Sequence, residues 1–174
     1  MESTDTPAPA SITPEPVVGP LELRQAMAAW TTGVAVITTS HGARPAGLVS
    51  TSFTSVSLDP PLVSWCVDRG STSFDIWSRA EGFAVHILSA DEADLVSRFA
   101  RRGGDKFHGL DWRPGITGAP LLTAGIARLE CRTHIRYDGG DHLILLGRVL
   151  VTDRRSAPAL TFSEGALTPA PIHP

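Results

Sequence analysis

Cysteine, lysine and long apolar runs are scarce in this sequence, and the shortages exclude whole classes of protein. Cys66 and Cys131 are the two cysteines, they form no CxxC pair, and each lies in a stretch that favours a strand. We therefore expect two reduced, buried thiols, with neither a disulfide framework nor a metal site. No apolar run approaches the ~20 residues needed to span a bilayer, so we expect no membrane partner. Lys106 is the single lysine.

Common catalytic signatures are also missing. There is no GxGxxG after a strand, no GxxxxGK[ST], no HExxH and no GxSxG. An enzyme of this sequence that uses a nicotinamide would therefore have to bind it without a Rossmann loop. The sequence indicates no nucleophile with a base, no paired carboxylates and no metal ligand, which favours chemistry supplied by a cofactor.

Charge and composition are those of an ordinary globular protein. Hydrophobic residues make up 42% and charged residues 19% of the chain. The net charge of −3 gives no basis for a nucleic-acid partner. The first residues are acidic and rich in proline, without a basic segment followed by an apolar one, so we expect no signal peptide and a cytoplasmic protein.

The chain is expected to form one domain between two tails. Residues 1–19 are rich in Ser, Thr, Pro, Ala and Glu, and this composition predicts a disordered N-terminal tail. Residues 163–174 have a similar composition and predict a C-terminal tail. Residues 20–162 contain no linker, repeat or low-complexity segment, and their length fits a single domain.

Short strands with few helices are predicted within this domain. Helical spacing over 21–30 places Leu23, Met27 and Trp30 on one face, and further helices are predicted over 71–79 and over 89–100, the latter capped by Ser89. Strands are predicted over 34–39, 46–57, 62–67, 83–88, 124–138 and 142–153. The glycine-rich segment 101–120 is long enough to be a functional loop. This order favours a β-barrel with flanking helices over alternating βαβ units.

A run of hydroxyl side chains, Ser50 to Ser55, interrupts the alternation expected of a half-buried strand. Hydroxyls at consecutive positions offer hydrogen bonds on both faces, which suits the polar edge and the sugar-alcohol chain of a flavin. A solvent-exposed edge strand rich in Ser and Thr explains the same run.

A second candidate is Arg69-Gly70-Ser71-Thr72-Ser73, directly after a predicted strand and before a helix. Free backbone N–H groups, hydroxyls and a guanidinium in one turn are typical of a phosphate site. A plain capped helix is the alternative.

Two further candidates involve a histidine and a lysine. His142 follows Gly140-Asp141 at a hairpin turn, where an imidazole could reach a ligand or simply be solvated. Arg98-Phe99-Ala100 and Lys106-Phe107 flank a Gly-Gly link and could close over a flat ring, or form a helix end and a surface loop.

Taken in order, these segments resemble the flavin reductase family, the reductase components of two-component flavin-dependent monooxygenases. The resemblance covers about residues 23–155. It rests on Arg24-x-x-Met27, Thr32-Gly-Val-Ala-Val-Ile-Thr-Thr39, Gly47-Leu48, Ser52-Phe-Thr-Ser-Val-Ser-Leu-Asp-Pro-Pro-Leu-Val63, Phe83-Ala-Val85, Arg98-Phe-Ala100, Asp105-Lys-Phe107, Gly118-Ala-Pro-Leu121, Leu129-Glu-Cys131, Gly140-Asp-His142 and Gly147-Arg-Val149.

The resemblance implies a mainly β fold with flanking helices, a split β-barrel of the FMN-binding type that works as a homodimer. It implies that FMN or FAD binds near the subunit interface, that NADH or NADPH is the hydride donor, and that a flavin-dependent monooxygenase component is the partner. Carried over position by position, it implies that the flavin and nicotinamide sites are formed by Leu48, Val49, Ser50, Thr51, Ser52, Phe53, Ser71, Ser73, Phe99, Ala100, Lys106 and His142. Of these, His142 is assigned to the nicotinamide nucleotide.

The sequence departs from the family pattern at three places. Val49 stands where Thr is common, which removes one possible flavin hydrogen bond, and His86 stands where Asn is frequent. The segment 158–165 lacks the basic and Tyr residues of the usual C-terminus.

The expected reaction is hydride transfer from nicotinamide C4 to flavin N5, driven by proximity. Two alternatives stay open at this point: a non-catalytic flavin- or haem-binding split barrel, and an enzyme that holds its flavin tightly and acts on an organic substrate.

Overall fold

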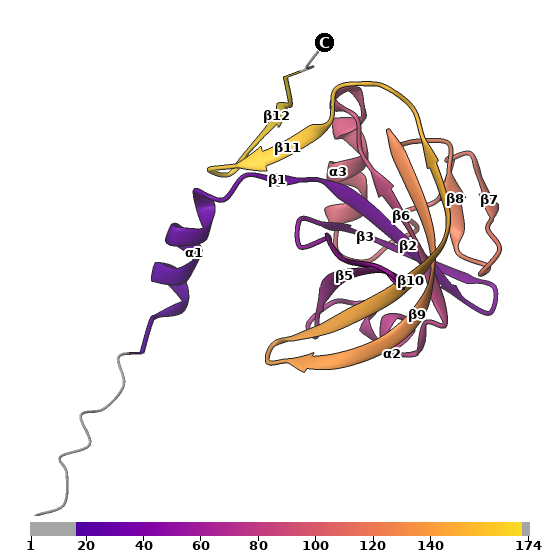
Figure 1. The fold of residues 1–174 in the computed structure, drawn as a ribbon, viewed down its shortest axis with the longest axis horizontal. Helices are drawn as coiled ribbons and strands as arrows, with labels where there is room; N and C mark the ends of the chain where they lie inside the picture. The colour runs from indigo at the N-terminus through magenta and orange to yellow at the C-terminus, as the bar shows by residue number, and fades with distance from the viewer. Residues whose placement is uncertain (1–16, 172–174) are drawn as a thin grey trace, which may run out of the picture.

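An antiparallel sheet of seven strands forms the body of the molecule (Figure 1). The structure, a computed structural model, describes residues 17–171, so that most of the predicted N-terminal tail lies outside the described residues. In spatial order the strands are β3 (Arg44–Ser50), β2 (Ala35–His41), β6 (Gly82–Ile87), β9 (Ala127–Gly139), β10 (His142–Arg154), β5 (Pro61–Asp68) and β4 (Thr54–Leu58). The predicted mainly β fold is confirmed.

The chain connection between β3 and β4 requires this sheet to roll up. The two strands lie at opposite edges of the sheet, yet only residues 51–53 join them. Seven flat strands span roughly 29 Å, whereas the four residue steps from Ser50 to Thr54 reach at most about 14 Å. The two edges must therefore approach one another. Ser52 marks the seam, where its Oγ accepts a 2.9 Å hydrogen bond from the backbone N–H of Cys66.

An arm extends from this body (Figure 1). It consists of α1 (Pro20–Ala28) and a three-stranded sheet in the order β1 (Thr32–Gly33), β11 (Leu160–Ser163) and β12 (Ala166–Pro169). Residues 163–174, predicted to be a C-terminal tail, thus contribute a strand, because β12 pairs with β11 from Leu160↔Pro169 to Ser163↔Ala166.

The predicted apolar face of the first helix exists but is not covered by the chain. Leu23, Met27 and Trp30 are 55%, 54% and 67% exposed, and α1 has no buried residue. The predicted helix is present but ends at Ala28, so that Trp30 follows it, and none of the described residues buries this face.

Two apolar clusters stabilise the body. Inside the rolled sheet, Trp65 packs edge-on against Trp77 at 4.9 Å and against Phe83 at 5.8 Å between ring centroids. The second cluster joins α3 (Ala93–Ala100) to the outer face of the sheet through Phe99 and Phe107. The remaining elements are α2 (Phe74–Arg79), η1 (Ala90–Glu92), β7 (Trp112–Pro114) and β8 (Pro120–Leu122).

Some predicted boundaries differ from the structure. The strand predicted over 46–57 is two strands, because the chain leaves one sheet edge at Ser50 and joins the other at Thr54. The helix predicted over 71–79 begins only at Phe74, since the preceding residues form a turn. The predicted cap Ser89 forms a capping box with Glu92, and its helix divides into η1 and α3.

Both cysteines are free, as predicted, although only Cys131 is fully buried. Burial raises the pKa of the Cys131 thiol to about 12, so that this side chain behaves as a small apolar group. Cys66 is half-buried at the seam of the rolled sheet.

His86 fastens β8 to the sheet from a fully buried position. Its Nε2 accepts a 3.0 Å hydrogen bond from the N–H of Leu122, so its Nδ1 carries the proton and donates to the carbonyl of Val36 at 3.2 Å. Both bonds require a neutral ring, and burial lowers the pKa of His86 from 6.5 to about 4.

Acid should therefore destabilise the fold through this residue. Below pH 6.5 the unfolded chain binds a proton that folded His86 rejects until about pH 4, so the free energy of unfolding falls as the pH drops through that window. The loss attributable to His86 should reach about 3 kcal/mol at pH 4. His86→Asn can make both hydrogen bonds without titrating. Urea unfolding between pH 7 and pH 4 should show a shallower decline for the variant, and equal declines would contradict this account.

Candidate functional site

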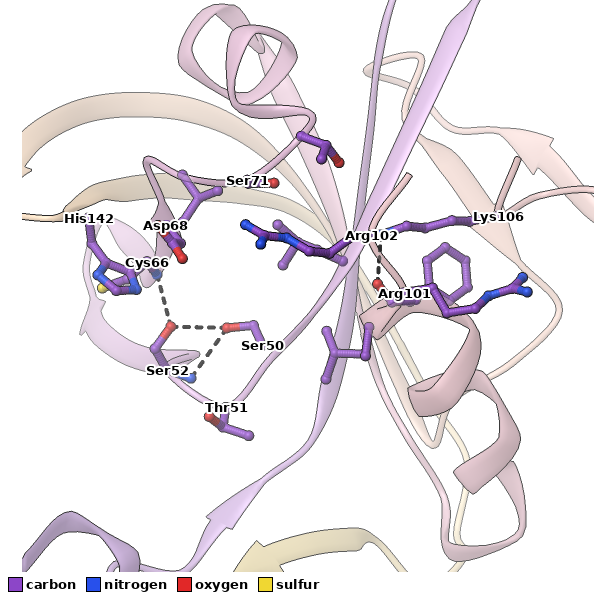
Figure 2. Close-up of a pocket in the computed structure, with 16 residues that line it drawn as sticks. Ser50, Thr51, Ser52, Cys66, Asp68, Ser71, Arg101, Arg102, Lys106 and His142 are labelled. Carbon is purple, nitrogen blue, oxygen red and sulfur yellow. Dashed lines mark hydrogen bonds between the residues drawn. The ribbon is translucent and has the colours of Figure 1, made fainter. Parts of the chain in front are cut away.

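A cavity of about 420 Å³ lies at the seam where the two edges of the rolled sheet meet (Figure 2). Its walls come from the end of β3, the 51–53 connection, the end of β5, the following turn, the loop after α3 and the start of β10. Ten of the twelve site residues predicted from the sequence line it: Leu48, Val49, Ser50, Thr51, Ser52, Ser71, Phe99, Ala100, Lys106 and His142.

The hydroxyl wall combines side chains with an open strand edge. Ser50 Oγ lies 3.0 Å from Ser52 Oγ and accepts from the N–H of Ser52 at 3.3 Å. These two serines therefore shape the seam, while Thr51 is exposed at the cavity. Because β3 pairs with β2 alone, its other edge presents backbone donors and acceptors there.

The turn after β5 forms a second wall. Asp68 accepts a 2.7 Å hydrogen bond from the N–H of Gly70 through its carboxylate, and the N–H of Ser71 donates to its carbonyl at 3.0 Å. Arg102 reaches across from the loop after α3 and donates to the carbonyl of Gly70 at 3.1 Å. The guanidinium of Arg102 thus lies near Ser71 at the cavity (Figure 2).

Lys106 fixes the third wall. Its ammonium donates to the carbonyls of Gly47, at 3.1 Å, and Phe99, at 2.7 Å, so it joins the edge strand to the end of α3. Burial, followed by the charge of Arg101, lowers the pKa of Lys106. An ammonium has three donors, which leaves one N–H for a ligand in the cavity that Lys106 lines.

His142 stands at the start of β10 on the wall that also contains Cys66 (Figure 2). Its Nδ1 hydrogen-bonds to the carboxylate of Asp141 at 2.7 Å, an interaction that lowers the pKa of Asp141. With Nδ1 engaged, Nε2 is the ring atom available to a ligand.

Two predicted site residues lie elsewhere. Phe53 lines a second cavity of about 1090 Å³ between the body and the arm, together with Met27 and Trp30. Ser73 accepts a 3.1 Å hydrogen bond from Trp77 Nε1 and lines a neighbouring hollow. Thr51 and Ser52 line both the seam cavity and the second cavity, so the two are adjacent.

Five residues that line the seam cavity belonged to no predicted candidate: Cys66, Val67, Asp68, Arg101 and Arg102. Thr72, which also lines it, lies in the predicted phosphate turn. The arginines follow directly on the predicted Phe99-Ala100, and this adjacency was a signal that the sequence offered. The β5 residues gave no such signal, because the sequence pattern of a strand does not show which other strand edge will lie beside it.

The arrangement suits a planar, polar ligand that carries negative charge. Hydroxyls and a free strand edge face one side, and Arg101, Arg102 and Lys106 supply cations on the other. Among residues 17–171, no three His, Cys, Asp or Glu side chains are grouped to hold a metal ion. None of the helices described has the length and apolar content needed to cross a membrane.

Comparison with known proteins gives a consistent result. The model of the family described as "Flavin reductase like domain" matches residues 27–170. The FMN reductase (NADH) SmoA of Agrobacterium fabrum is 44% identical over 143 residues, 82% of each chain. The reductase subunit HsaB of a Mycobacterium tuberculosis flavin-dependent monooxygenase is 36% identical over 132 residues, 76% of this chain and 71% of that protein. The NADH:FAD oxidoreductase SgcE6 of Streptomyces globisporus superposes with a TM-score of 0.80 at 37% identity, covering 90% of this chain and 98% of that chain.

The wall formed by β3 and α3 should not tolerate a side chain at Gly47. A Cβ there would lie 2.4 Å from Phe99 Cε1, so Gly47→Ala must displace the ring or the strand. Overpacking of this kind costs about 1–3 kcal/mol of unfolding free energy. Gly33→Ala is the matched control, because a Cβ there meets nothing within 4 Å. Denaturant unfolding should separate the two variants, and equal stabilities would contradict the packing described.

Proposed function

The chain belongs to the flavin reductase-like domain family, and we propose that it transfers hydride from NADH or NADPH to FMN or FAD and supplies the reduced flavin to a partner monooxygenase. The observation that carries this proposal is the seam cavity, which gathers hydroxyls, a free strand edge, an aromatic ring and three cations in one place. SmoA and SgcE6 are named as reductases of FMN and FAD that use NADH. HsaB is named as the reductase subunit of a monooxygenase.

The residues present fit a flavin. The edge of β3 and Thr51 offer donors and acceptors for the polar end of the ring system and for the ribityl chain. Phe99 supplies apolar surface, and Ser71 with Arg102 supplies donors for a phosphate. A bound flavin contributes the electron-accepting chemistry of the reaction.

The nicotinamide is assigned to the wall formed by His142. The Nε2 atom of its ring faces a ligand while Asp141 holds Nδ1, which orients the imidazole. The described residues need only bring the two rings into contact and exclude misaligned poses, and proximity alone can supply several orders of magnitude in rate.

The openness of the site favours flavin as an exchangeable substrate. Ala100, Arg101 and Arg102 all line the cavity and are all exposed, so the described residues of one chain do not enclose the ligand. A protein that stores flavin, or that keeps it during turnover on an organic substrate, needs a more enclosed site.

An assay of nicotinamide oxidation tests the function. The purified protein should oxidise NADH or NADPH rapidly when FMN or FAD is added in excess, with a rate that saturates in flavin. Removal of free flavin by gel filtration should abolish the activity, and its return should restore it. A protein that stays active after removal, or that shows no activity with any pairing of flavin and nicotinamide, would refute the proposal.

We also propose a homodimer, supported by the arm. Met27 on the exposed face of α1, and Trp30 just after the helix, border the 1090 Å³ cavity next to the seam. A second chain placed there would cover apolar surface and complete the wall behind Thr51 and Ser52.

Light scattering should therefore give the mass of two chains at micromolar concentration. Trp30→Glu should shift the protein towards monomer, because it places a charge in the covered surface. Ile116→Glu is the matched control, since Ile116 is 64% exposed on the body, in the β7–β8 segment. A wild-type monomer, or equal effects of the two variants, would argue against this interface.

A further inference from the structure

Arg69 ties the tip of the β9–β10 hairpin to the body. Its guanidinium donates through Nε to the carbonyl of Gly140 at 3.0 Å and through Nη2 to the carboxylate of Asp138 at 2.8 Å. Its backbone N–H donates to the carbonyl of Asp141, also at 3.0 Å. One residue thus contacts three of the four residues that precede His142.

The position of the hairpin tip depends on these contacts, because the tip extends past the end of the neighbouring strand β5. The pairing of β10 with β5 ends at His142↔Asp68, so the turn at Gly140 and Asp141 has no strand beside it on that side. The tip is also exposed, and the side chain of Asp138 is 79% accessible. Within the described residues, Arg69 ties this turn to the body, through its side chain at Asp138 and Gly140 and through its backbone N–H at Asp141.

The position of His142 follows from that of the turn. Asp141, whose carbonyl accepts from the N–H of Arg69, also holds the Nδ1 atom of His142 through its carboxylate. A rotation of the turn would therefore change both the backbone entry to His142 and the orientation of its ring.

Arg69 itself does not line the seam cavity. Its guanidinium lies over the ring of Phe74, 5.7 Å from the centroid, and faces Asp138 rather than the ligand space. The hydrogen bond from Arg69 lowers the pKa of Asp138, because it stabilises the ionised carboxylate. Exposed ion pairs contribute little to global stability, so the effect of this one is expected to be local.

We propose that Arg69 is a positioning residue: it locks the 138–141 turn so that the Asp141–His142 pair presents Nε2 to the nicotinamide nucleotide. The inference rests on the proposed function, because it assigns Arg69 to the nicotinamide step and not to flavin binding.

The test is a double-mutant cycle between Arg69→Met and His142→Ala. His142→Ala should raise KM for the nicotinamide about five- to a hundredfold, the value of one lost hydrogen bond. Arg69→Met keeps an unbranched apolar side chain but removes the guanidinium donors, and should raise the same KM about three- to tenfold. The kcat value and the flavin dissociation constant should stay near wild type. In the His142→Ala background, Arg69→Met should have no further effect.

Arg128→Met is the matched control. Arg128 on β9 forms an ion pair with Asp153 on β10, 2.9 Å long, at the end of the hairpin away from the turn. It should leave KM unchanged. If Arg128→Met raises KM as much as Arg69→Met does, the effect is general loosening of the hairpin and the inference is wrong.

The other outcomes are equally decisive. Additive effects of Arg69→Met and His142→Ala would mean that Arg69 contacts the nucleotide directly, and a changed flavin affinity with unchanged KM would place it on the flavin wall. Either result overturns the positioning role, as does an active Arg69→Met protein with wild-type KM. A wild-type protein without nicotinamide oxidation refutes the proposed function instead, so the two failures are distinguishable.

Discussion

The three-residue connection between β3 and β4 is the constraint on which the site depends. It joins strands at opposite edges of a seven-stranded sheet, and its short reach forces the edges together. In a flat sheet, Leu48 and Cys66 would lie several strand spacings apart; in the rolled sheet they line one cavity. The hydrogen bond from the N–H of Cys66 to Ser52 stabilises this seam. The unpaired edge of β3, a liability in most sheets, thereby faces the candidate site.

The sequence predicted most elements and most of the site, and its errors have one physical origin. The local pattern predicts an unusual strand over Ser50 to Ser55, because hydroxyl side chains replace the expected alternation of apolar and polar residues. In the structure the alternation fails because the chain leaves the sheet at Ser50 and re-enters it at Thr54. Strand propensity describes the fit of a side chain to a pleated surface, and it carries no information about which edge the strand will join. Phe53 does not line the seam cavity for the same reason: it lies on the arm side of the connection.

Residues whose role depends on long-range closure were harder to predict. Arg102 reaches the carbonyl of Gly70 from a segment more than thirty residues away along the chain, a contact that only the tertiary fold creates. The exposed face of α1 shows the complementary limit. The spacing of its apolar residues predicts the helix from the sequence. Burial, however, requires a second surface that covers this face, and residues 17–171 do not supply one. His86 gave only a strand signal, although its two hydrogen bonds hold β8 in place.

The geometry of a site of this kind depends strongly on residues that do not contact a ligand. Hydride transfer between two bound rings requires the protein to align them, and a displacement of about one ångström lowers the rate strongly. The walls must therefore be held more firmly than global stability requires. Lys106 does so for the β3 wall by bonding the carbonyls of Gly47 and Phe99, and Arg69 does so for the His142 wall. Both use cationic donors on backbone carbonyls, which fix main-chain position directly and leave the facing side chains for the ligands. Substitution of a residue such as Arg69 can therefore change substrate affinity without changing any residue that contacts the ligand. The substitution shifts the position of the wall and leaves the contacting side chains the same.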